Sequence, residues 1–168
     1  MSKEQVIEFL KKDHAKLELV LEALTDEMMI IHRITGTWRI KDILAHISAW
    51  NKKLTEAIDL LIKDEKPWFM ESFSEEEFNK IQIVKRKSMS LKEIRDEWEQ
   101  SFNDMIKKIE RLSDSEWEYK TPHKYRDGTE VTVESLFGYR YRGHGHEGGH
   151  ANQIEEYFDR DDCDCEIY

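Results

Sequence analysis

Long stretches of helical periodicity constrain this chain more than any other feature of its sequence. Apolar residues recur at helical spacing over residues 2–24, 39–63 and 90–112, which places them on one face of an amphipathic helix. The chain has only two prolines and seven glycines, too few for a many-turned β-sandwich or barrel. The sequence therefore predicts an all-α fold built from long helices that each bury one face.

Signals at the helix ends agree with these boundaries. Ser2 with Gln5, and Ser90 with Glu93, have the spacing of a capping box, in which two side chains satisfy backbone N–H groups of the first turn. Pro67 follows the second stretch, and proline disfavours helical backbone at the residue before it. Three helix ends are thus marked independently of the apolar pattern.

The segments between the long helices are predicted to be short. We expect a shorter helix over residues 74–86, a single turn at 113–117, and a tight turn or small hairpin over 125–131 around an Asp-Gly pair. A last helix would begin near Thr132. Together these elements predict a four-helix bundle with a short additional helix before the third long helix and a small turn or hairpin before the last helix.

A glycine cluster conflicts with that last helix. Five glycines fall within twelve residues, and in a helix interior they would cost roughly 4–5 kcal/mol relative to alanine. Residue propensity alone leaves open both a helix and a flexible Gly/His-rich loop. The cluster consists of Gly138, Gly143, Gly145, Gly148 and Gly149.

The length of the chain and the distribution of its charge indicate how many domains it contains. A chain of 168 residues and 20.2 kDa corresponds to one ordinary domain, and its 11% aromatic residues provide the bulky apolar mass that disordered chains lack. Residues 155–168 carry −6 of the net charge of −10. We predict a single domain over residues 1–160, followed by an acidic tail over residues 161–168.

Hydropathy and charge also narrow the expected location and partners. No run approaches the ~18 apolar residues of a membrane span, and the N-terminus lacks the apolar core of a signal peptide, so we expect a cytoplasmic protein without membrane partners. The net charge of −10 argues against a nucleic-acid partner, because phosphate binding requires a basic face. Cys163 and Cys165 are expected to be reduced and inert or, alternatively, to bind an adventitious soft metal.

Two histidines four residues apart form the candidate chemical site. His146 and His150 would project from the same face of a helix, one turn apart, and this spacing is typical of metal chelation. A chance surface pair is the alternative. At helical spacing the same face continues through Tyr139, Arg142, Gln153 and Tyr157.

A third histidine lies far away in the sequence. His46 flanks the apolar stripe of the second predicted helix, beside Ile43 and Ile47, and is therefore expected to be at least partly buried. It is either a core histidine with satisfied hydrogen bonds or, if the second and last helices are neighbours, a third nitrogen for the pair. Three histidines with an open position would make a catalytic type of metal site.

Two motifs in this chain resemble those of the DinB/YfiT-like superfamily. The first combines Gly-Thr-Trp at residues 36–38 with Lys-Asp-Ile-Leu-Ala-His-Ile-Ser-Ala-Trp-Asn at residues 41–51, and the second is His-Glu-Gly-Gly-His-Ala-Asn-Gln-Ile at residues 146–154. The resemblance implies a four-helix bundle whose metal is held by one histidine of the second helix and a His-x-x-x-His pair on the last.

Carried over residue by residue, the resemblance implies that His46, His146 and His150 are the metal ligands, and it supports a helix through the glycine cluster. Two positions depart from the family pattern. Arg39 stands where a capping serine or threonine is usual, and Gly149 stands where a further histidine is frequent.

The resemblance also implies a function. Family members include metal-dependent thiol S-transferases, and hydrolase-like activities are attributed to the group. We therefore predict a metal-dependent transferase or hydrolase that acts on a small molecule, with a low-molecular-weight thiol as a candidate partner, in detoxification or stress response. Zn or Ni is expected ahead of Fe or Mn, and a homodimer is expected by analogy. The alternative is a non-catalytic bundle that binds or sequesters a small molecule, or a dimeric interaction module.

Four further residues are candidates for substrate binding or for supporting the ligands. Asp42, one turn before His46, is placed to accept its second ring proton, or is simply a first-turn acid favoured by the helix dipole. Arg142 is suited to a substrate carboxylate or phosphate, or is a solvated surface charge. Trp50 belongs to the pocket or to the core, and Gln153 shares the histidine face.

The remaining polar residues near these motifs are expected to be outside the site. His144 should face solvent. Glu147 lies about 100° away from the ligand face and is not expected to act as a general base. His14, His32 and His123 are interpreted as ordinary polar residues.

Overall fold

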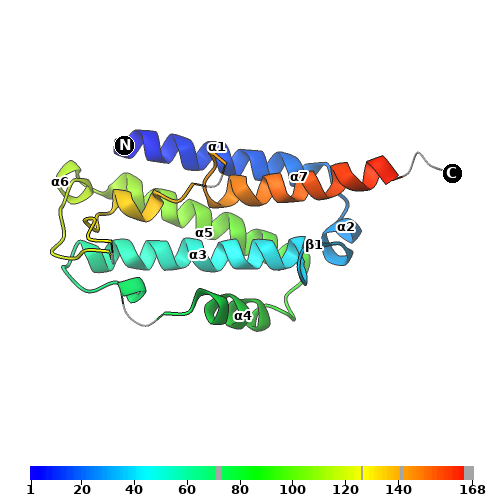
Figure 1. Ribbon diagram of the computed structural model, residues 1–168, viewed down its shortest axis with the longest axis horizontal. Coiled ribbons are helices and arrows are strands. Elements are labelled where there is room, and N and C mark those ends of the chain that lie inside the picture. The colour runs from blue at the N-terminus through cyan, green and yellow to red at the C-terminus, as the bar shows by residue number, and fades with distance from the viewer. Residues whose placement is uncertain (71–72, 126, 141, 165–168) are drawn as a thin grey trace.

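Four long helices lie side by side and make up most of the molecule (Figure 1). The computed structural model describes residues 1–70, 73–125, 127–140 and 142–164, so Cys165 and the end of the predicted acidic tail lie outside the described residues. Helix α1 packs along α7, and α3 packs along α5. The predicted all-α four-helix bundle is confirmed. Its helices are α1 (Lys3–Glu22), α3 (Ile40–Leu61), α5 (Leu91–Arg111) and α7 (His146–Asp164).

Capping boxes begin two of these helices as predicted. Ser2 Oγ accepts a hydrogen bond from Gln5 N, while Gln5 Oε1 accepts one from Ser2 N. The same reciprocal pair joins Ser90 and Glu93 at the start of α5. These side chains satisfy backbone donors that have no partner within the helix.

Shorter elements connect the long helices. The tight turn near residue 125 is confirmed by the hydrogen bond from Tyr125 N to Thr129 O. A short helix and an antiparallel two-stranded hairpin before α3 were not predicted, because strands of three and two residues are too short to show a period. The short elements are α2 (Asp26–Ile31), β1 (Arg33–Thr35), β2 (Trp38–Arg39), η1 (Trp68–Met70), α4 (Glu75–Lys85), α6 (Asp114–Trp117) and η2 (Glu134–Phe137).

The last helix begins at His146, and the predicted start near Thr132 is wrong. Arg142 and Gly143 have φ angles of 51° and 85°, and this left-handed conformation cannot continue a right-handed helix. Gly143 adopts it without steric cost. Three of the five clustered glycines therefore precede the helix, so both the helix and the loop interpretations of this segment are partly correct.

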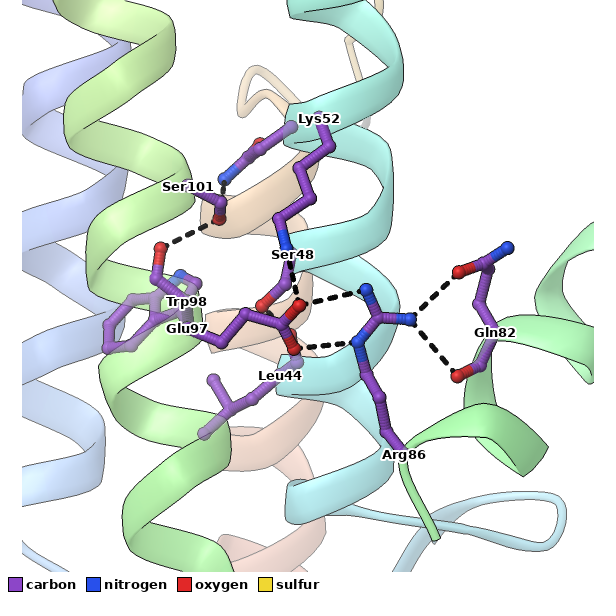
Figure 2. A network of polar contacts seen from close by, with 9 residues as sticks. Leu44, Ser48, Lys52, Gln82, Arg86, Glu97, Trp98 and Ser101 are labelled. Carbon is purple, nitrogen blue, oxygen red and sulfur yellow. Dashed lines mark hydrogen bonds and ion pairs between the residues drawn. The ribbon is translucent and has the colours of Figure 1, made fainter. Parts of the chain in front are cut away.

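Helix α4 is attached to the bundle by an ion-pair network between α3, α4 and α5 (Figure 2). Arg86 Nε and Nη2 donate to the two carboxylate oxygens of Glu97 at 2.6 and 2.9 Å, and Lys52 Nζ donates to the same carboxylate. Burial raises the pKa of Glu97, but the hydrogen bonds from Arg86 and Lys52 outweigh it and lower the pKa overall. A bidentate, partly buried pair of this kind fixes geometry as well as charge.

The apolar core forms two clusters along the bundle, with buried polar residues between them. One cluster contains Val6 and Ile58, and the other contains Leu17 and Ile43. Among the described residues, no helix has both the length and the apolar character needed to cross a membrane. The intervening polar residues include Asp13, His14, Asn51, Ser101 and Glu147.

Candidate metal centre

Three imidazoles from two helices converge at one point on the bundle. His46 lies on α3, and His146 and His150 lie on the first turns of α7. His146 Nε2 is 2.8 Å from His46 Nε2 and 3.2 Å from His150 Nε2. The structure thus brings together the three histidines that the sequence analysis singled out, and they form a group able to hold a metal ion.

The other ring nitrogens are held by amide oxygens. Asn79 Oδ1, on α4, accepts a hydrogen bond from Trp50 Nε1 at 2.9 Å and lies 3.0 Å from His46 Nδ1. Gln153 Oε1 lies 2.8 Å from His150 Nδ1. Because an amide oxygen only accepts hydrogen bonds, both Nδ1 atoms are assigned as protonated, which leaves lone pairs on both Nε2 atoms.

These tautomers leave the centre of the triad short of protons. His146 Nε2 can carry one proton and donate it to one neighbour, so at least one nitrogen lone pair stays without a hydrogen there. A tetrahedral ion with metal–nitrogen bonds of about 2.0–2.1 Å separates its ligand nitrogens by about 3.3 Å. The separation of 3.2 Å between His146 and His150 matches this value, and that of 2.8 Å between His46 and His146 is shorter. The donor set and its geometry therefore fit a divalent cation.

The electrostatic environment keeps the three rings neutral. Burial, with a smaller contribution from His150, lowers the pKa of His46 to about 3 despite the hydrogen bond with Asn79. Burial is also the main cause of the lowered pKa values of His146 and His150. Among the described residues, no carboxylate forms a hydrogen bond or ion pair with the triad. Neutral imidazole is the form that binds metal.

Aromatic rings lie beside His46, while His146 and His150 remain partly exposed. The His46 ring centroid is 4.9 Å from that of Trp38 and 6.3 Å from that of Trp50. His46 is buried, whereas His146 and His150 are only partly buried. The triad is therefore bordered by aromatic rings on the α3 side and keeps some solvent exposure on the α7 side.

A buried carboxylate on α1 positions the start of α7. Asp13 accepts hydrogen bonds from Gly145 N at 2.5 Å and His144 Nδ1 at 3.1 Å, so His144 does not simply face solvent as expected. A Cβ atom on Gly148 would lie 2.4 Å from Asp13 Oδ1. Close approach of α7 to α1 therefore requires glycine at this position, which explains why a poor helix former occurs beside His146 and His150.

Glu147 occupies the centre of the bundle and contacts all three other long helices. It lies 2.7 Å from His14 Nδ1 on α1, and its other oxygen accepts hydrogen bonds from Asn51 Nδ2 on α3 and Trp98 Nε1 on α5, both at 3.2 Å. The prediction that His14 is an ordinary polar residue is wrong, because it is buried against this carboxylate. The flanking glycines indicated tight packing, but nothing local in the sequence identified these partners.

The structure separates the four supporting candidates. Gln153 contacts His150, and Trp50 is linked to His46 through Asn79. Asn79 was not predicted, because no local signal places α4 beside α3. Asp42 does not contact His46: its carboxylate accepts the Arg39 backbone N–H at 2.9 Å, as a first-turn acid does. Arg142 precedes α7, is exposed and pairs with Glu156, so it does not share the histidine face of the helix.

Comparison with solved structures supports the same fold. An uncharacterised protein from Escherichia coli UTI89 has a TM-score of 0.73 and 12% identity, with 96% of this chain and 95% of that chain covered. A mycothiol-dependent maleylpyruvate isomerase has a TM-score of 0.65 and 12% identity, with 92% of this chain covered; this chain spans only 58% of that protein. No curated protein sequence matches the chain.

A third similar structure corrects one prediction. The colibactin self-resistance protein ClbS, solved in complex with dsDNA, has a TM-score of 0.70 and 13% identity, with 94% of this chain and 95% of that chain covered. Because this fold occurs in a DNA complex, the net charge of −10 does not exclude a nucleic-acid partner, and that prediction is wrong.

The family assignment rests on the sequence as well as the fold. The model of the DinB superfamily matches residues 9–154, which include all three triad histidines and nearly the whole bundle. The chain belongs to the DinB superfamily.

Proposed function

We propose that this protein is a metal-dependent enzyme that acts on small molecules, as a thiol S-transferase or a hydrolase, with the ion held by His46, His146 and His150. One observation carries the proposal: His146 Nε2 lies 2.8 Å from His46 Nε2 and 3.2 Å from His150 Nε2, and no carboxylate within the described part of the chain contacts these imidazoles. Three neutral ligands leave the charge of a divalent ion uncompensated.

The residues around the triad have separable roles in this proposal. A divalent ion in such a site supplies Lewis acidity, which lowers the pKa of water or a thiol so that a nucleophile exists at neutral pH. Asn79 and Gln153 hold two rings in the ligating tautomer. The rings of Trp38 and Trp50 exclude water beside His46 and offer an apolar surface to the substrate.

The thiol class is supported by the similar fold of the mycothiol-dependent maleylpyruvate isomerase. The name of that enzyme states that it depends on mycothiol, and this chain is similar to 58% of its length. We propose that a low-molecular-weight thiol reaches the triad from the partly exposed side of His146 and His150 and attacks an electrophile.

Metal analysis tests the ligands directly. Protein purified without a histidine tag should lose one equivalent of Zn²⁺ or Ni²⁺ when His46→Ala is introduced, because a three-nitrogen site does not survive loss of its buried member. His32→Ala is the matched control, since His32 contacts Tyr157 and lies outside the triad. Equal metal content in the two variants would contradict the proposed site.

Turnover tests the reaction class. The metal-loaded protein should accelerate the reaction of glutathione or cysteine with a chromogenic aryl halide, or the hydrolysis of an activated ester, and His46→Ala should abolish the acceleration. Stoichiometric metal with no turnover on either panel would favour the alternative, a non-catalytic bundle that sequesters a small molecule.

A nucleic-acid partner is a second candidate function, and the ClbS–dsDNA complex is the observation that favours it. Fluorescence anisotropy with a labelled duplex should show binding that weakens as salt increases, because phosphate contacts release counterions. No change in anisotropy at low salt would remove this candidate without affecting the metal site.

A further inference from the structure

A second cluster of potential metal ligands lies on a different side of the bundle. His14 and Glu18 are one turn apart on α1, and Glu99 faces them from α5. One ligand atom of each lies within 4.8 Å of the others. The triad, in contrast, is built from α3 and α7, so the two groups share no residue and no helix.

The orientation of His14 is fixed from the interior. Its Nδ1 atom lies 2.7 Å from Glu147 Oε2, and both side chains are buried. The ring also stacks on Phe102, with ring centroids 3.7 Å apart. The remaining nitrogen, Nε2, therefore points toward Glu18 and Glu99. In metal-ligating histidines, a carboxylate typically holds the ring nitrogen that does not bind the metal, as Glu147 holds Nδ1 here.

The outward nitrogen lacks a hydrogen bond in the described part of the chain. His14 is only 7% exposed, and Nε2 approaches Glu99 Oε2 to 3.4 Å. Charge-assisted N–H···O hydrogen bonds are typically about 2.7–2.9 Å long. Nitrogen and oxygen ligands of one tetrahedral ion are separated by about 3.4 Å. The spacing thus suits an ion between the two groups better than a direct bond.

We propose that His14 Nε2 and the carboxylates of Glu18 and Glu99 form a second divalent-cation site, with Glu147 as the positioning residue for His14. Two carboxylates neutralise the charge of the ion, which the triad does not do. One nitrogen and two oxygens suit Mn²⁺ or Zn²⁺, whereas three imidazoles favour Zn²⁺, Ni²⁺ or Cu²⁺. The two sites therefore differ in metal preference.

A proton competes with this cation. Burial disfavours the charged ring of His14, but hydrogen bonding to Glu147 and the charges of Glu147, Glu99 and Glu18 outweigh burial and raise its pKa. The same negative surroundings attract a metal ion, which must displace the proton. Binding at this site should therefore weaken as the pH falls.

Metal titration of the intact protein tests the second site. Metal-stripped wild-type protein should bind two equivalents of Zn²⁺, and His46→Ala should bind one. Glu99→Gln preserves the side-chain volume at a residue whose side chain is 42% exposed, and this variant should also bind one equivalent. The His46→Ala/Glu99→Gln double variant should bind none. Glu22→Gln, at an exposed position on α1, is the matched control and should keep two equivalents.

Two results would overturn the proposal: a single wild-type equivalent that His46→Ala removes, or two equivalents that persist in both Glu18→Gln and Glu99→Gln. A single equivalent that Glu99→Gln removes and His46→Ala retains would support the second site and contradict the proposed function. Mn²⁺ electron paramagnetic resonance gives an independent measurement in the His46→Ala background, where the bound signal should disappear with Glu99→Gln. Circular dichroism checks that each variant is folded.

Discussion

The triad and the environment of His14 are two buried histidine regions of one bundle with opposite electrostatics. Burial lowers the pKa of His46 to about 3, with no carboxylate contact to oppose it in the described structure. His14 is buried to the same degree, at 7% exposure for both residues, yet its pKa is raised because Glu147 contacts it. Burial alone therefore does not decide the charge of a histidine, because the partner of the ring decides whether its pKa is raised or lowered.

The two regions also differ in how their polar groups are satisfied. Glu147 receives hydrogen bonds or contacts from three helices, so the protein itself completes that network. The triad has more lone pairs than protons at its centre, so its nitrogens could hold an external ion. The Glu147 network stabilises the bundle and fixes only Nδ1 of His14, whereas the centre of the triad is available for binding. Four predictions test this contrast.

The largest effect is expected from Glu147→Ala. Removing the carboxylate leaves a buried His14 without its counter-charge, and breaking a buried pair in this way costs about 3–5 kcal/mol. The free energy of unfolding from urea denaturation measures the loss. Asp159→Asn, at an exposed position on the same helix, should change it by less than about 0.5 kcal/mol. Similar stability in both variants would show that Glu147 is not part of a stabilising network.

The pH dependence of the metal-free protein should reveal the triad. The unfolded chain protonates His46 near pH 6.5, whereas the folded protein does so only at about pH 3, so stability falls as the pH drops below 6.5. For His46 alone this amounts to roughly 2 kcal/mol between pH 7 and pH 5. The raised pKa of His14 acts in the opposite direction: its contribution is present below pH 6.5 and is lost as the pH rises through the folded pKa.

Urea denaturation at the two pH values in the presence of a chelator makes this measurement. His46→Ala should reduce the loss of stability between pH 7 and pH 5. An identical pH dependence in wild type and variant would mean that His46 is not held neutral by the fold.

Removal of the amide that orients His46 should weaken metal binding without unfolding the protein. Asn79→Ala eliminates the acceptor for His46 Nδ1, and loss of such an outer contact reduces metal affinity by about 10–100-fold. Competition with a fluorescent chelator measures the affinity. Glu76→Ala, at an exposed position on the same short helix, should leave affinity unchanged, and an equal reduction there would point to a general effect of α4 instead.

The smallest effect is expected from Asp42→Asn. This residue stabilises the start of α3 through the Arg39 backbone N–H, and a first-turn acid contributes about 0.3–1 kcal/mol. Unfolding should become easier by that amount, while metal affinity stays at the wild-type value. A large loss of affinity would instead restore the idea that Asp42 supports His46.

The long helices and the pair of His146 and His150 were predictable because both depend on local signals. Apolar spacing and capping boxes mark a helix within a few residues, and a His-x-x-x-His pair shares a face wherever a helix forms. The resemblance to the DinB/YfiT-like superfamily then related His46 to that pair. In contrast, the start of α7 was misplaced, because the left-handed turn at Arg142 and Gly143 depends on how the chain enters the bundle.

The sequence by itself determined that this chain is a helical bundle with a His-x-x-x-His pair at His146 and His150, because apolar periodicity and residue spacing are local properties of a helix. The resemblance to the DinB/YfiT-like superfamily added His46 as a candidate third ligand. Only the tertiary structure decided that Asn79 supports His46, that Glu147 joins the four long helices, and that His14 faces Glu18 and Glu99. The physical reason is that hydrogen bonds and charges act over a few ångströms in space. Residues far apart in the sequence acquire their partners only when the helices pack.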